Sequence, residues 1–236
     1  MIEPKPTWRS RFPTIVLGIV CTSLLVFLIS YEGCDKACGE WDYISDLLIE
    51  NSHGNEVERW NRTPTIGVAE ATMYELEMTR YAVYELNDVL KETRMAVRFT
   101  EEENPDILVR FISRDFLRQT GREFDIEEQI EGLCETFTED SGTISSARIL
   151  IQTSLPQGDK WGVLLHELGH ALGITGHTDR YLSSLFYSDI KGGALSDGFS
   201  SDDKKLLDFL YRHLEPGQHE RSVHAAFEAN WRMRPE

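Results

Sequence analysis

The chain has 236 residues, a length that suits one domain with a sizeable core plus appendages rather than two large domains. Its 41% hydrophobic and 27% charged residues are ordinary values for a globular protein, which excludes a wholly disordered chain and a polytopic membrane protein. With 24 basic against 40 acidic residues the formal net charge is -16, and a surface of that sign repels the phosphates of nucleic acids. We therefore expect a monomer with no nucleic-acid partner.

The N-terminal segment, residues 1–31, has the pattern of a signal peptide or an N-terminal membrane anchor. Lys5, Arg9 and Arg11 precede an uncharged run over residues 12–30, and acidic residues follow it. The run is close to the boundary between a signal-peptide core and a spanning helix of about 20 residues, so cleavage and retention are both open. The basic flank predicts that the rest of the chain lies outside the cytoplasm, either anchored to the membrane or secreted or periplasmic after signal cleavage.

Residues 32–56 are rich in polar residues, and we interpret them as a tether between the membrane segment and the domain. Cys34, Cys38 and Cys134 would face an oxidising compartment if the chain is exported. Cys34 follows a glycine, as in a bacterial lipoprotein cleavage site, but lacks the small and aliphatic residues expected further upstream. The sequence leaves two pairings open, Cys34 with Cys38, or Cys38 with Cys134 if Cys34 is lipidated.

Residues 57–215 have the hydrophobic patterns of a single α+β domain. An amphipathic helix is predicted over residues 69–90, where apolar residues recur at alternating spacings of four and three. Period-two alternation and β-branched residues predict extended segments, in chain order, over residues 59–68, 95–99, 106–112, 132–137 and 147–152. The segment over 132–137 is the candidate edge strand, and a long polar stretch over 113–129 precedes it.

Two further helices are predicted in the C-terminal half of the chain. The first covers residues 161–172, with Asp159 available as its cap and Gly173 placed to end it. The second covers residues 204–214 after an acidic first turn. The tail, residues 216–236, has the composition of a short amphipathic helix, docked either on the domain or on a partner.

The predicted helix over 161–172 carries the HExxH pattern of a zinc site. Residues four apart stand on one face of a helix, so His166 and His170 can bind one Zn2+ ion at about 2.0 to 2.1 Å. Glu167 is rotated off this line and can reach the open side of the ion, where it is the candidate general base for a bound water. Gly173 turns the chain out of the helix, and His177 follows within reach of the same ion.

The string from His166 to His177 resembles the signature of the metzincins, most closely of their matrixin-like branch, in which HExxHxxGxxH is followed by a turn that contains Met. The order of the predicted elements over residues 57–215 is similar to that branch as well. The resemblance implies a zincin-type fold with a twisted mixed sheet, a long helix, an active-site helix and a C-terminal helix. It also implies a zinc endopeptidase whose peptide or protein substrate lies antiparallel to the edge strand over 132–137.

The sequence departs from the metzincin pattern at two places. Gly176 stands where the family has its third His, and His177 comes one residue later, so Asp179 is the alternative third ligand. Phe186 stands where the Met of the turn is expected, and an apolar Phe can still form the floor of the site. Tyr187 is a candidate for a hydrogen bond to the oxyanion of the transition state, with packing of its ring in the core or rim as the alternative.

The sequence leaves two other functions open. One is a catalytically impaired metzincin-like module that binds a protein or a surface polymer, which the altered spacing and the missing Met permit. The other is a zinc amidase acting on a cell-wall peptide by the same chemistry. Glu167 favours an enzyme, because a binding module has no chemical need for a carboxylate beside two metal ligands.

Overall fold

The computed structural model describes residues 39–123, 130–187 and 198–231 of the chain. Within these ranges one five-stranded sheet has the strand order β2-β1-β3-β5-β4. The strands are β1 (Thr65–Ala69), β2 (Arg98–Phe99), β3 (Ile107–Ile112), β4 (Gly132–Thr138) and β5 (Ile144–Gln152). All pairs are parallel except β4 with β5, so the sheet is mixed and its antiparallel strand β4 is at an edge.

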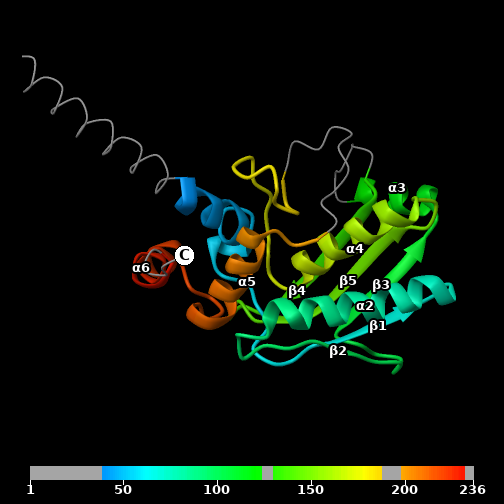
Figure 1. Ribbon diagram of the computed structural model, residues 1–236, viewed down its shortest axis with the longest axis horizontal. Coiled ribbons are helices and arrows are strands. Elements are labelled where there is room, and N and C mark those ends of the chain that lie inside the picture. The colour runs from blue at the N-terminus through cyan, green and yellow to red at the C-terminus, as the bar shows by residue number, and fades with distance from the viewer. Residues whose placement is uncertain (1–38, 124–129, 188–197, 232–236) are drawn as a thin grey trace, which may run out of the picture. The chain divides into compact units, whose positions relative to one another are not determined.

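Helices cover both faces of the sheet, with α2 (Met73–Leu90), α3 (Arg114–Glu123) and α4 (Gln157–Ala171) in contact with its strands. The other helices are η1 (His53–Asn55), α5 (Ser201–His213) and α6 (Glu220–Asn230). The long helix α2 and the helix α4 lie side by side along one face (Figure 1). Leu117 of α3 packs with Leu150 in a separate small cluster, and since neighbouring residues of β5 belong to the main core, α3 lies on the opposite face.

A buried ion pair joins α2 to α4. The backbone N–H of Thr72 donates to Oε2 of Glu75 at 2.9 Å, and the side chain of Thr72 accepts from the N–H of Glu75, which forms a capping box at the start of α2. Nζ of Lys160, in the first turn of α4, donates to Oε1 of Glu75 at 2.8 Å. Burial alone would raise the pKa of Glu75, but the hydrogen bonds from Lys160 and Thr72 outweigh it and hold that pKa below its ordinary value.

Most of the predicted elements are present, with shifts at their ends that have local causes. The helix predicted over 69–90 begins at Met73 because Thr72 caps it. The strand predicted over 95–99 shortens to β2. The polar stretch over 113–129 contains α3, which the sequence did not reveal because few of its residues are apolar.

The structure departs from the prediction at the segment interpreted as a polar tether, residues 32–56. Residues 41–48 are helical and belong to the main core. Their fully buried side chains recur in pairs four residues apart: Tyr43, Ile44, Leu47 and Leu48. This spacing is that of one helix face, but the polar residues between the pairs conceal it in the local composition.

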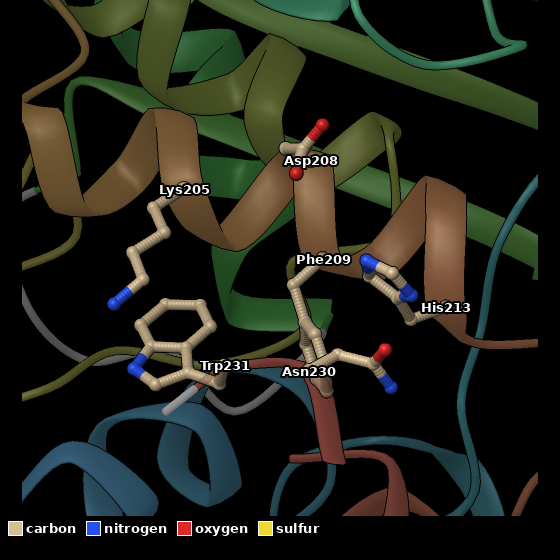
Figure 2. A pocket seen from close by; sticks show the side chains of 6 residues that line it. All are labelled: Lys205, Asp208, Phe209, His213, Asn230 and Trp231. Carbon is tan, nitrogen blue, oxygen red and sulfur yellow. The ribbon is translucent and has the colours of Figure 1, made fainter. Parts of the chain in front are cut away.

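The tail docks on the domain as far as the structure describes it. Phe227 and Trp231 are buried, and the Trp231 ring meets Phe209 of α5 edge-on with ring centroids 5.6 Å apart. Figure 2 shows the hollow between α5 and α6, where Nζ of Lys205 lies 4.0 Å from the centroid of the Trp231 ring. The cavity volume of about 10 Å³ is far below the range of small-molecule sites, so we assign it no ligand.

Several predictions on export and cysteine chemistry lie outside the described residues. These are the signal or anchor over residues 1–31 and the roles of Cys34 and Cys38. In the ranges that the structure describes, no helix combines the length and the apolar character needed to cross a membrane. The thiol of Cys134, on β4, is free.

The buried pair of Lys160 and Glu75 predicts a large effect on stability. We expect Lys160→Ala to lower the free energy of unfolding by about 3 kcal/mol, because it leaves the Glu75 carboxylate buried without its partner. The control is Lys91→Ala, whose pair with Asp88 is 59% and 57% exposed and should contribute less than about 1 kcal/mol. Denaturant unfolding of both variants is the measurement, and equal losses would contradict the assignment.

Candidate metal centre

The candidate site is built on α4, which packs against β4 and β5. The helix begins at Gln157 with Pro156 at the capping position, so Asp159 lies in the first turn and the predicted cap was wrong. Its end is as predicted. Gly173 has a φ of 101°, and a Cβ at this position would lie 2.2 Å from the carbonyl oxygen of Glu58, so glycine is needed on both grounds.

Three imidazoles converge at the end of α4. Nε2 of His166 lies 2.9 Å from Nε2 of His170 and 3.1 Å from Nε2 of His177. The ligand atoms of the three residues lie within 4.8 Å of one another, an arrangement that could hold a metal ion. Nitrogens bound to one tetrahedral zinc would be about 3.3 Å apart, given zinc to nitrogen distances of about 2.0 to 2.1 Å. The spacing of the donor atoms therefore suits one shared ion.

The two helical histidines are held in the tautomer that binds metals. Nδ1 of His166 donates to the carbonyl oxygen of Leu185 at 2.8 Å, and Nδ1 of His170 donates to that of Ile174 at 2.5 Å. A carbonyl can only accept, so each Nδ1 carries the proton and each Nε2 presents a lone pair.

Burial favours the neutral form of the two helical histidines, and partial desolvation does the same for His177, which is exposed on its loop. It lowers the pKa of His166 to about 4, with a further contribution from His177, and lowers the pKa of His170 well below its ordinary value. Burial also lowers the pKa of His177. Neutral imidazole is the form that binds a metal, so the site loses no affinity to protonation near pH 7.

Phe186 forms the floor beneath the imidazoles. Its ring is fully buried, and its centroid lies 5.2 Å from that of His166 and 5.4 Å from that of His170. A Cβ at Gly169 would lie 2.3 Å from Cζ of Phe186, so glycine at this position of α4 makes room for the ring. An aromatic ring thus fills the volume below the two ligands.

A buried carboxylate holds the turn that orients His166. Asp203 accepts hydrogen bonds from the hydroxyl of Tyr43 at 2.9 Å, from the hydroxyl of Ser184 at 2.6 Å and from the N–H of Leu185 at 3.0 Å. The carbonyl of Leu185 is the acceptor for His166, so Asp203 acts on the ring through this turn. The sequence showed the acidic first turn of α5 but gave no signal for this link to Tyr43.

The side chain of Glu167, on α4, lies against Gly132, the first residue of β4. Its side chain is 7% exposed, and a Cβ at Gly132 would lie 2.5 Å from its Oε1. Burial raises the pKa of Glu167 to about 8. A cation held by the histidines would act in the opposite direction, since a nearby positive charge favours the carboxylate.

Two further residues predicted for the site, Asp179 and Tyr187, are not part of the cluster of three histidines. Asp179, the alternative third ligand, is 70% exposed on its side chain and pairs with Nε of Arg180 at 3.2 Å. Tyr187 pairs through its backbone with Thr178, in a bridge that ties the turn after α4 to the turn carrying Phe186. The catalytic role of Tyr187 stays a prediction.

One family of proteins of unknown function (DUF2927) matches residues 45–229. The chain belongs to this family. No curated protein matches the chain in sequence. The matched residues begin within the helical segment before η1 and end within the helix α6.

Two solved structures of myroilysin are similar to the chain. One has 12% identity and a TM-score of 0.40, and the similarity covers 71% of this chain and 92% of the other. The second has 12% identity and a TM-score of 0.41, covering 65% of this chain and 82% of the other. A likeness at this level carries no information about chemistry, so the function depends on the residues of the site.

The packing of Phe186 below the site predicts that alanine is tolerated at one glycine of α4, Gly158, and not at another, Gly169. We expect Gly169→Ala to weaken zinc binding and to lower the free energy of unfolding by about 1 to 3 kcal/mol, because the new methyl group overlaps the Phe186 ring. Gly158→Ala is the control, since its Cβ would meet no atom within 4 Å. Chelator competition and denaturant unfolding measure the two effects, and equal behaviour of the two variants would refute the packing role of Gly169.

Proposed function

We propose that the chain is a zinc-dependent metalloendopeptidase of the metzincin type. The observation that carries the proposal is the convergence of three Nε2 atoms at the helix on which the buried Glu167 directly follows the first ligand. Imidazole is a preferred ligand of Zn2+, and three protein ligands leave the fourth tetrahedral position open for water or substrate, as in catalytic zinc sites. A structural zinc site would instead fill all four positions.

The residues of the site support hydrolysis of a peptide bond. Zinc, when bound, supplies a water of lowered pKa and polarises the scissile carbonyl. Glu167 follows the first ligand directly, so its carboxylate is the group positioned to accept the proton of the attacking water and return it to the leaving amine. His166 and His170 keep their Nδ1 protons on backbone carbonyls and take no part in this transfer.

The edge strand supports an extended peptide as the substrate. β4 is the last strand in the sheet order and, among the described strands, pairs with β5 alone. Its outer edge can therefore offer backbone groups to an added antiparallel strand. Gly132 opens β4 against the Glu167 carboxyl group, so a peptide along this edge would pass the catalytic residue.

We also propose a location for the enzyme. A catalytic domain outside the cytoplasm, anchored through residues 1–31 or released by signal cleavage, fits the basic flank before the apolar run. Two alternatives use the same residues. A zinc amidase would differ only in cleaving a cell-wall peptide, and a binding module would hold zinc without turnover.

The proposal predicts a separation between metal binding and hydrolysis. We expect Glu167→Gln to bind zinc as the wild type does and to hydrolyse a pool of denatured proteins at least about 100-fold more slowly, because the proton acceptor is lost. His170→Ala should lose both properties. The control is Glu103→Gln, an exposed glutamate outside the site, which should behave as the wild type.

Three outcomes would overturn parts of this proposal. If zinc-loaded wild type cuts no protein of the pool and no cell-wall peptide, the chain is a binding module. If it cuts the cell-wall peptide alone, the amidase is correct. If Glu167→Gln hydrolyses as fast as the wild type, Glu167 is not the general base.

A further inference from the structure

The loop that carries His177 is bound on both sides of this residue by the helical segment before η1. The carbonyl oxygen of Leu47 accepts from the N–H of Thr175 at 2.8 Å and from that of Gly176 at 3.3 Å. Beyond His177, the hydroxyl of Thr178 donates to Oδ2 of Asp46 at 3.0 Å. Thr178 is 2% exposed and the side chain of Asp46 is 18% exposed, so this bond is partly buried.

The close approach at Gly176 explains the shifted position of the third histidine. A Cβ at Gly176 would lie 2.0 Å from the carbonyl oxygen of Asp46, so no other residue fits there. The extra residue between Gly173 and His177 is thus absorbed by a contact with the segment before η1, which the sequence could not show. At Gly176 the reason for glycine is space, whereas at Gly173 a left-handed conformation adds to the lack of space.

The supporting segment is itself fixed in the core. Tyr43 and Leu47 are fully buried, and the Tyr43 hydroxyl donates to Asp203, which also holds the turn that orients His166. The same segment therefore reaches both the loop of the third histidine and the network behind the first. Because this segment is packed in the core, it can hold a metal ligand on a loop in a fixed position.

We infer that Asp46 and Leu47 are positioning residues, which hold His177 in the place from which it completes the metal site. His166 and His170 are oriented by carbonyls that accept from their Nδ1 atoms, and both are carried by a regular helix. His177 lies on a loop, and the backbone on either side of it is fixed by these two residues. The inference rests on the proposed metal site and adds to it a requirement for residues outside the HExxH string.

The test is a double-mutant cycle on the full chain with zinc affinity as the readout. Thr178→Val removes the hydroxyl that binds Asp46 and keeps the shape of the side chain. We expect it to weaken zinc binding roughly 10- to 100-fold in the wild type, the usual effect of losing a group that supports a ligand. In the His177→Ala background we expect less than about a twofold change, because the residue it positions is absent.

Matched controls separate positioning from general stability. Thr120→Val removes another buried hydroxyl, which donates to the carbonyl of Phe116 within α3, and should leave zinc affinity unchanged. With Co2+ in place of zinc, the absorption spectrum of Thr178→Val should move towards that of His177→Ala. Asp46→Ala removes the acceptor of the same hydrogen bond. It replaces Thr178→Val in the test if that variant does not fold.

Each result supports or overturns the inference. Equal losses of zinc affinity in both backgrounds would mean that Thr178 and Asp46 stabilise the fold only, and the positioning role would be wrong. An unchanged affinity of Thr178→Val and Asp46→Ala, with a reduced affinity of His177→Ala, would also overturn it while leaving the metal site intact. A wild-type chain that binds no zinc would instead refute the metal site, and the positioning role with it.

Discussion

The structure depends on one electrostatic constraint, the meeting of three imidazoles in which Nε2 of His166 lies 2.9 Å from that of His170 and 3.1 Å from that of His177. His166 and His170 each commit their Nδ1 proton to a backbone carbonyl, so the facing Nε2 atoms, 2.9 Å apart, present lone pairs to one another. Lone pairs at that distance repel unless a cation lies between them. Burial opposes the proton as that cation, because it lowers the pKa of both residues. A metal ion shared by the three histidines would satisfy the arrangement, and their donor atoms are close enough to hold one.

The rest of the domain can be understood as support for this centre. The buried pair of Lys160 and Glu75 fixes the start of α4 on α2, and the Phe186 ring fills the space below its ligands. Asp203 joins α5 to the turn that accepts the Nδ1 proton of His166. These contacts come from parts of the chain far apart in sequence, which is how a site on one helix and one loop acquires a rigid frame.

The sequence predicted the local parts of the site and missed those that depend on distant contacts. HExxH was readable because the helix period alone sets residues 166 and 170 side by side, and Gly173 was readable because ending a helix requires a local conformation. Tyr43 and Asp203 are separated by 160 positions, and no periodicity links them. The segment before η1 was interpreted as a tether because its apolar pairs are diluted by polar neighbours. The sequence likewise showed His177 one residue out of the family's register, but gave no sign of the close contact between Gly176 and Asp46 that precedes it.

The most direct test is a crystal structure of the full chain grown with zinc, with anomalous diffraction measured at the zinc edge. A shared metal centre predicts a single strong anomalous peak at about 2.0 to 2.1 Å from Nε2 of His166, His170 and His177. The same structure should show that no protein atom occupies the fourth coordination position of the zinc. No peak at the three histidines in a chain soaked with excess zinc would contradict the account. So would a peak whose third protein ligand is Asp179.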